Sequence, residues 1–178
     1  MRIKMKRLKC YTIIGIIFVI ITGTLFHFLY DWTNKNFIVG LFTPINESVW
    51  EHMKLIFFPM LLYSFIMILN LKNDYPCITS SLCFGILIGT LLIPIFFYAY
   101  TFILGKNTLV FDIFIFVLSI IIAFFAAYKF TLSCKLQPYT LLLCFLISVL
   151  FICFVFFTFY PPHFKIFEDP THSKVSTL

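Results

Sequence analysis

Five apolar runs, each long enough to cross a lipid bilayer, divide this chain of 178 residues. They cover residues 10–30, 53–71, 77–100, 110–128 and 139–160. A helix needs about 20 mostly apolar residues to span the hydrocarbon core, and only closed hydrogen-bonded structures are stable there. The sequence therefore predicts an all-α integral membrane protein. We expect a bundle of five transmembrane helices forming one domain over residues 1–160, followed by an extracytoplasmic tail at 161–178.

The composition excludes soluble classes of protein. Only 11% of the residues are charged and 62% are hydrophobic, whereas soluble domains are about 25% charged. The net charge of +6 does not indicate nucleic-acid binding, because five of the 13 basic residues lie before residue 10. We expect membrane lipids as partners and no nucleic acid. The first run exceeds the apolar core of a cleavable signal peptide, about 7–15 residues, so we expect a retained anchor.

The distribution of Lys and Arg predicts how the bundle is oriented. If the amino terminus is cytoplasmic, the amino-terminal segment and the segments at 72–76 and 129–138 hold eight basic residues. The opposite segments hold five. Cytoplasmic segments of membrane proteins carry the excess of Lys and Arg. The sequence therefore predicts an amino terminus inside and a carboxy terminus outside.

One polar stretch, residues 44–54, stands directly before the second apolar run. We expect it to be a helix capped by Asn46 or Thr43, with Pro44 in its first turn. At helical spacing Glu47, Glu51 and Lys54 share one side. The stretch is thus predicted to be a polar head on a membrane helix.

The predicted topology gathers ionisable side chains at the outer membrane face. These are His27, Asp31, Glu47, Glu51, His52, Asp112 and His163. Ionisable groups near the membrane are costly, so they usually face a cavity or each other. Two carboxylates four residues apart on a helix repel unless a cation or a proton lies between them.

Three interpretations of this convergence stay open. The first is a structural helix cap, in which Lys54 pairs with Glu51 and His27 pairs with Asp31. The second is a metal-assisted or acid/base enzyme acting on lipid or envelope material. In it Glu47 and Glu51 are the catalytic candidates. The candidate ligands of a divalent metal such as zinc are His27, Asp31, Glu51, His52 and His163. The third is a small-solute transporter or binding protein, or an accessory membrane subunit.

The six cysteines carry no recognisable pattern. All lie within the apolar runs or on the predicted cytoplasmic side, and no two are spaced Cys-x-x-Cys. We therefore expect neither structural disulfides nor a thiolate zinc site, and interpret these residues as small apolar filler.

Small residues recur at helical spacing in the third and fourth runs. Cys77, Ser81, Gly85 and Gly89 form one stripe, and Ser119, Ala123 and Ala127 form another. Such stripes allow helix backbones to approach closely. We expect these two helices to pack together, within one chain or between two. The second case would make Gly85 and Gly89 a contact for a homo-oligomer or a partner helix.

Three segments carry a resemblance to a known group of proteins. They are residues 27–32 (HFLYDW), residues 40–54 (GLFTPINESVWEHMK) and residues 160–163 (YPPH), the last followed by Asp169-Pro170. With them the chain resembles a family of small bacterial multi-pass membrane proteins of unknown function. The resemblance covers nearly the whole chain, although the carboxy-terminal residues 173–178 depart from the family's tail. It implies a bacterial cytoplasmic membrane protein and implies no reaction.

Overall fold

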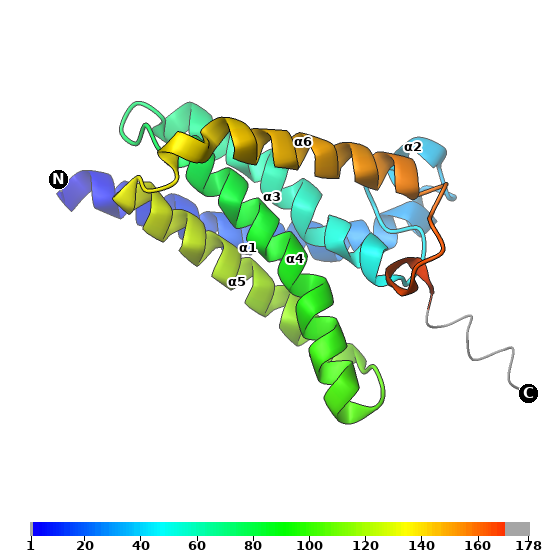
Figure 1. Ribbon diagram of the computed structural model, residues 1–178. Helices are drawn as coiled ribbons and strands as arrows, with labels where there is room; N and C mark the ends of the chain where they lie inside the picture. Colours follow the sequence, from blue (N-terminus) through cyan, green and yellow to red (C-terminus); the bar gives the residue numbers. More distant parts are fainter. Residues whose placement is uncertain (1, 170–178) are drawn as a thin grey trace, which may run out of the picture.

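A computed structural model of the chain describes residues 2–169, and this part is helical throughout its core (Figure 1). The five long helices are α1 (Arg2–Trp32), α3 (Val49–Leu71), α4 (Ile78–Leu104), α5 (Leu109–Ser133) and α6 (Thr140–Phe157). Each coincides with a segment long and apolar enough to cross a membrane. The predicted five-helix membrane protein is confirmed. Three short elements complete it: α2 (Phe37–Gly40) and the 3₁₀ turns η1 (Gln137–Tyr139) and η2 (Lys165–Phe167).

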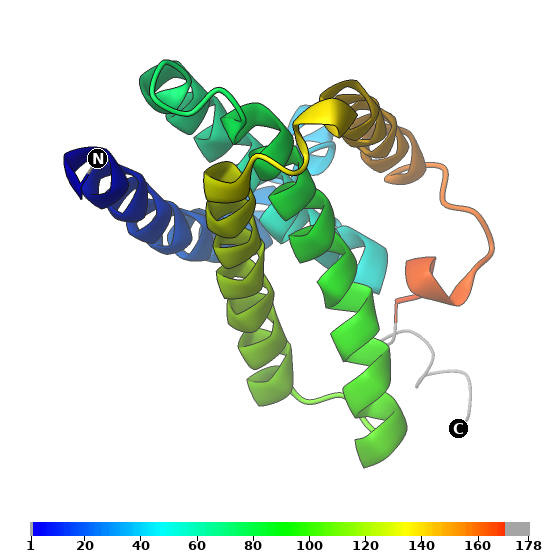
Figure 2. The ribbon, with the colours of Figure 1, turned by 60° about the vertical axis from the view of Figure 1, so that its left-hand side comes forward.

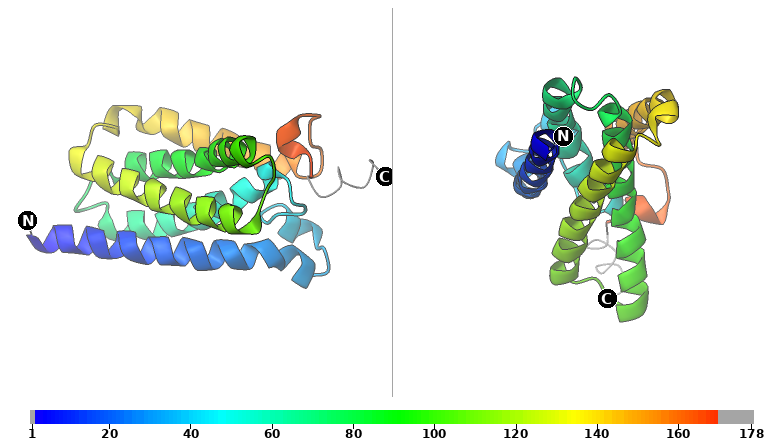
Figure 3. Two further views of the ribbon diagram at one scale, coloured as in Figure 1. Left: turned by 90° about the horizontal axis from the view of Figure 1, so that it is seen from below. Right: turned by 90° about the vertical axis from the view of Figure 1, so that its left-hand side faces the viewer.

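The helices alternate in direction and create two ends of the bundle (Figure 3). One end, here called the amino end, holds the start of α1 and the connections at 72–77 and 134–139. The other, the far end, holds the connections at 33–48 and 105–108 and the segment after α6. Figures 1 and 2 show the α4–α5 hairpin diverging from α6 as it approaches the far end. The segments predicted to carry the ionisable side chains thus share one end.

Helix α3 is the centre of the bundle. Fifteen of its 23 residues are buried, compared with three of the 18 residues of α6. The ring of Phe57 packs against Phe154 of α6 with their centroids 5.0 Å apart, and Trp50 contacts both Phe154 and Phe167. The first three turns of α3, which carry the polar head, are therefore enclosed by protein, whereas its later turns are partly exposed, as at Leu69.

The predicted packing of the third and fourth helices occurs within one chain. A Cβ atom on Gly85 would lie 2.8 Å from the carbonyl oxygen of Ala123 on α5, and one on Gly89 would lie 2.7 Å from the Ala123 Cβ. Only glycine permits this approach. Both glycines are buried against α5 and α3, so their stripe serves the fold. Association with a second copy or a partner helix stays a prediction.

The structure contains a disulfide bond that the sequence analysis did not expect. Cys77, just before α4, is bonded to Cys134, just after α5, with their Cα atoms 5.3 Å apart. The expectation that no cysteine forms a structural disulfide is wrong. The two residues are 57 positions apart, and only the antiparallel α4–α5 hairpin brings them together. The other four cysteines are free thiols: Cys10, Cys83, Cys144 and Cys153.

Candidate metal site

Helix α3 begins later than the sequence predicted. Ser48 is its N-cap and accepts a hydrogen bond from the backbone N–H of Glu51, while the Asn46 side chain accepts one from the Ser48 N–H. Ser and Asn are both strong N-cap residues. The N-cap residue lies just before the helix, because its own backbone dihedral angles are not helical. The predicted caps, Asn46 and Thr43, and the helical position of Pro44 are therefore wrong.

This shift separates the two glutamates that were predicted to share one helix face. Glu51 lies in the first turn of α3, whereas Glu47 lies in the connection before it. Their expected repulsion at helical spacing does not arise. Each carboxylate has a different environment, and they must be considered as two sites.

Glu51 forms a buried ion pair with Lys54. The Lys54 Nζ lies 2.8 Å from Glu51 Oε2, and the side chains are 0% and 2% exposed. The predicted pairing of these two residues is confirmed. The same Glu51 oxygen also accepts a hydrogen bond from the backbone N–H of Ile45. A buried charge is tolerated only when it is paired and hydrogen-bonded.

Lys54 also ties three segments of the far end together. Its ammonium donates to the carbonyl oxygens of Gly40 and Thr43 at 3.1 and 3.4 Å, and to Thr158 Oγ1 at 2.5 Å. These partners belong to α2, the connection after it, and the end of α6. The pair therefore anchors the connection that carries Glu47. Glu51 therefore has a structural role, and its predicted catalytic and ligand roles stay predictions.

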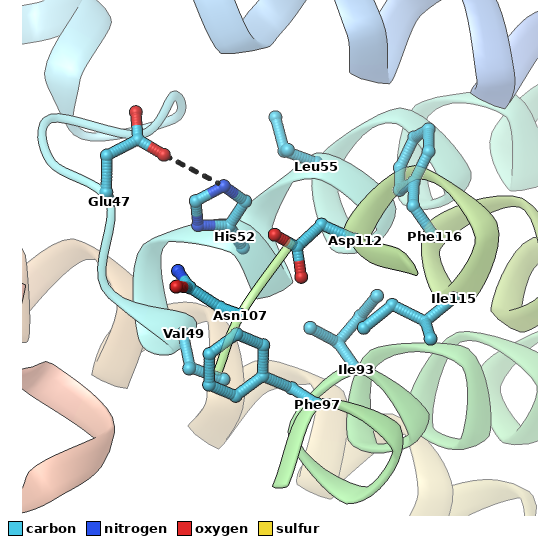
Figure 4. Close-up of a pocket in the computed structure, with 10 residues that line it drawn as sticks. All are labelled: Glu47, Val49, His52, Leu55, Ile93, Phe97, Asn107, Asp112, Ile115 and Phe116. Atoms are coloured by element: carbon cyan, nitrogen blue, oxygen red, sulfur yellow. Dashed lines mark ion pairs between the residues drawn. The ribbon is translucent and has the colours of Figure 1, made fainter. Parts of the chain in front are cut away.

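Three other predicted residues do gather at the far end. The ligand atoms of His27, Glu47 and His52 lie within 4.8 Å of one another. One carboxylate oxygen of Glu47 is 3.9 Å from His27 Nε2, and the other is 3.4 Å from His52 Nε2. Figure 4 shows the Glu47 carboxylate directed at the His52 ring. We call this group the His27–Glu47–His52 cluster.

A backbone hydrogen bond orients His52 within the cluster. Its Nδ1 lies 2.9 Å from the carbonyl oxygen of Ser48, and a carbonyl can only accept. Nδ1 therefore carries the hydrogen, and in the neutral ring Nε2 presents its lone pair toward Glu47. Histidines that bind metals usually have their second nitrogen held in this way by a carbonyl or a carboxylate.

Gly23 brings His27 to this position from α1. A Cβ atom on Gly23 would lie 2.5 Å from the carbonyl oxygen of Leu55 and 2.7 Å from the Phe116 ring. Helix α1 therefore touches the α3 backbone at Gly23. His27 is one turn further along α1 and His52 one turn earlier along α3, so the crossing places the two imidazoles side by side. Their ring centroids are 5.3 Å apart.

A cavity of about 220 Å³ adjoins the cluster between α3, α4 and α5 (Figure 4). Its polar lining consists of Glu47, His52, Asn107 and Asp112. Asp112 accepts a short hydrogen bond from the Tyr100 hydroxyl. Asp112 was expected at this membrane face from its place at the start of the fourth apolar run. Asn107 was missed, since a loop asparagine carries no signal of its own.

Besides Glu51, two predicted ligands lie outside the cluster. Asp31 is exposed on α1, and His163 is exposed after α6. Among the described residues, the only group of three or more His, Cys, Asp and Glu side chains close enough to share a metal ion is His27, Glu47 and His52. A hydrogen bond to the segment after α6 also holds the cluster in place, because the Glu47 N–H donates to Asp169 Oδ2 at 3.3 Å.

Neither the curated proteins nor the solved structures contain a match to the chain. Residues 1–176 match a family of unknown function, DUF6512. The resemblance noted in the sequence is thereby confirmed at the level of a family without an assigned activity. The chain is a member of the DUF6512 family, a multi-pass membrane protein by its five apolar helices.

Proposed function

We propose that this protein binds a divalent metal ion, zinc foremost, at the His27–Glu47–His52 cluster and uses it to hydrolyse a membrane-associated substrate. The observation that carries the proposal is the convergence of two imidazoles and one carboxylate within 4.8 Å. They come from α1, the connection before α3, and α3 itself. The fold thus brings His27 of the first helix to two residues that lie five positions apart at the start of α3.

The ligand set supports zinc more than other divalent ions. Imidazole nitrogen suits zinc, whereas calcium and magnesium prefer oxygen ligands alone. Two histidines and a glutamate are also the ligands of one class of catalytic zinc site, in which the fourth position is left to water or substrate. The cavity beside His52 and the half-exposed Glu47 side chain leave room for that position.

The surroundings support hydrolysis as the reaction type. A zinc ion lowers the pKa of its bound water to about 7 and so would supply a nucleophile at neutral pH. Asp112 lines the same cavity as His52, and a carboxylate there is suited to accept a proton in general base catalysis. We propose Asp112 as this base, and Asn107 as a hydrogen-bonding partner of the substrate.

Metal content tests the proposal directly. The protein is purified in mild detergent and its zinc, manganese and iron are measured by elemental analysis, alongside Glu47→Gln and His52→Ala. We expect about one metal ion per chain in the wild type and loss of more than 90% in both variants, since each removes one of three ligands.

Two further variants are matched controls, because they remove the same residue types outside the cluster. Asp31→Asn and His163→Ala are expected to retain the metal. Absence of metal from the wild type after supplementation with zinc would overturn the proposal. The cluster would then be an ion-paired polar surface at the head of α3.

A further inference from the structure

The cavity beside the cluster has one polar side and one apolar side. Its polar side is made by the carboxylates of Glu47 and Asp112 together with His52 and Asn107. Its apolar wall is made by Leu55, Ile93, Phe97, Ile115 and Phe116. A molecule that fills it must therefore be polar at one end and hydrocarbon at the other.

The apolar wall lies within helices that are long and apolar enough to span the membrane. Ile93 and Ile115 are 4% and 6% exposed, so the wall is a built interior surface. The adjacent ends of α4 and α5, on either side of the polar turn at 105–108, are apolar and 72–91% exposed at Phe102, Ile103, Leu109 and Val110. Hydrocarbon can therefore continue from the wall to the lipid-facing surface.

We infer that the cavity binds one acyl chain of a neutral, single-chain amphiphile and places its ester group at the His27–Glu47–His52 cluster. This inference rests on the proposed function, because it names the substrate that a hydrolytic metal site would receive. It goes further than the proposed function because it specifies that the substrate has one acyl chain and no net charge.

The size of the cavity argues for one chain. Its volume of about 220 Å³ lies below the 300–1,000 Å³ of pockets that enclose a drug-sized ligand. A lipid with two acyl chains cannot enter as a whole. One chain can place its proximal part between α4 and α5 while the rest extends along the exposed hairpin tip.

The charge of the lining argues for a neutral headgroup. Glu47 and Asp112 contribute two carboxylates, and a divalent ion would at most balance them. An anionic headgroup would meet like charges, which are unfavourable at short range in a low-dielectric site. An ester carbonyl instead has a lone pair for a metal ion and accepts a hydrogen bond from the Asn107 amide.

The corresponding reaction balances as ester hydrolysis. The oxygen of water bonds to the carbonyl carbon and the carbon–oxygen bond of the ester breaks. One hydrogen of the water goes to the alcohol oxygen, and the products are a fatty acid and an alcohol. No oxidant, reductant or second substrate is required.

Photo-crosslinking in phosphatidylcholine nanodiscs tests where the chain binds. The probe is a monoacylglycerol with a diazirine in its acyl chain, and adducts are mapped by mass spectrometry. We expect adducts concentrated in residues 93–97 and 112–116 and displaced by excess unlabelled monoacylglycerol. Ile93→Phe and Ile115→Phe, which fill the cavity from two different helices, should each reduce these adducts about tenfold.

Matched controls exist two residues away on the same helices. Ile95→Phe and Ile113→Phe lie on surfaces 58% and 55% exposed and should leave the adducts unchanged. A fatty-acid probe of equal chain length, which is anionic, should label the cavity more weakly. Labelling spread evenly over the lipid-facing surfaces, or equal for filling and control variants, would overturn the inference.

The same samples separate this inference from the proposed function. Metal content is measured on each variant, and crosslinking is repeated on Glu47→Gln and after chelator treatment. Cavity adducts without any bound metal would refute the metal site and leave the acyl-chain site standing. Bound metal without cavity adducts would refute the acyl-chain site alone.

Discussion

At the scale of single residues, the far end depends on a lysine that has no exposed surface. Lys54 is 0% exposed and has four hydrogen-bonding partners, Glu51 among them. Removing one member of such a pair leaves the other charge buried and uncompensated, which typically costs about 3–5 kcal/mol. Replacing both by uncharged groups of similar volume costs much less.

We therefore expect Lys54→Met to lower the free energy of unfolding by about 3 kcal/mol or more. The double variant Lys54→Met with Glu51→Gln should recover a large part of this loss. Thermal unfolding in detergent, followed by circular dichroism, measures both. Lys106→Met, at an exposed position, is the control. Equal stability of the wild type and Lys54→Met would show that the pair does not anchor the far end.

At the scale of elements, the cluster depends on how closely α1 crosses α3. Gly23 meets the backbone of Leu55, and no side chain can be accommodated at that point without moving a helix. Interiors resist such movement because they are close-packed. The contact between the two histidines is therefore set by a glycine that carries no chemistry.

Gly23→Leu is expected to push α1 from α3 and to destabilise the protein by about 1–3 kcal/mol through overpacking. It should also lower metal content in the proposed site, because His27 moves from His52. Elemental analysis and thermal unfolding of the same preparation check both effects. Thr24→Leu, whose side chain is exposed on the same helix, should alter neither. Full metal occupancy in Gly23→Leu would contradict the assignment of His27 as a ligand.

A second contact between elements lies at the amino end, where Asp74 joins the α3–α4 connection to α1. Its carboxylate lies 2.9 Å from Lys4 and 3.3 Å from Arg7. The hydrogen bond from Lys4 lowers the pKa of Asp74 below its ordinary value. A carboxyl group whose pKa is lower in the folded than in the unfolded protein stabilises the fold at pH values above the unfolded pKa. This stabilisation is lost as the pH falls through the folded pKa.

We expect the wild type to lose stability as the pH is lowered from 5 to 3, around and below the ordinary Asp pKa of about 3.9. Asp74→Asn should lack this component of the pH dependence. The effect should be small and weakened by salt, because Lys4 and Arg7 are solvent-exposed and Asp74 is partly exposed. Unfolding curves at several pH values, at low and high salt, measure it. Identical pH profiles for the two proteins would exclude a contribution from Asp74.

At the scale of the whole molecule, two features of the amino end make opposite predictions about its compartment. The excess of Lys and Arg predicts the cytoplasm, whereas the Cys77–Cys134 disulfide is typical of an oxidising compartment. We propose that the orientation follows the basic residues, so that the amino terminus is cytoplasmic in a bacterial membrane. The disulfide present in the structure would then be reduced in the cell, which leaves two thiols close enough to bond again when oxidised.

Thiol labelling in intact cells distinguishes the two orientations. A membrane-impermeant maleimide should not react with Cys77 or Cys134, whereas a permeant one should react with both without prior reduction. Labelling of the double variant Cys77→Ser with Cys134→Ser measures the signal from the other thiols, which is subtracted from that of the wild type. A pair that becomes reactive only after reduction would place the amino end outside and the cluster in the cytoplasm.

The structure confirms what depended on periodicity and composition. The apolar runs predicted five membrane helices, and the small-residue stripes predicted the α4–α5 contact at Gly85 and Gly89. The start of α3 was predicted wrongly, because Asn46 and Ser48 are both good caps and the sequence does not decide between them. The disulfide was missed because Cys77 and Cys134 are neighbours only across a hairpin.

By itself the sequence determined that this chain forms five membrane helices and that three of its histidines lie at the same end as most of its acidic residues, because hydrophobic length and loop position are local properties. Only the tertiary structure decided which of those residues meet. It buries the predicted Glu51–Lys54 pair in the interior and joins Glu47 to His27 and His52. Which of these residues meet depends on α3 starting at Val49 and on α1 crossing α3 at Gly23. Such contacts arise from packing between distant segments, which no local pattern encodes.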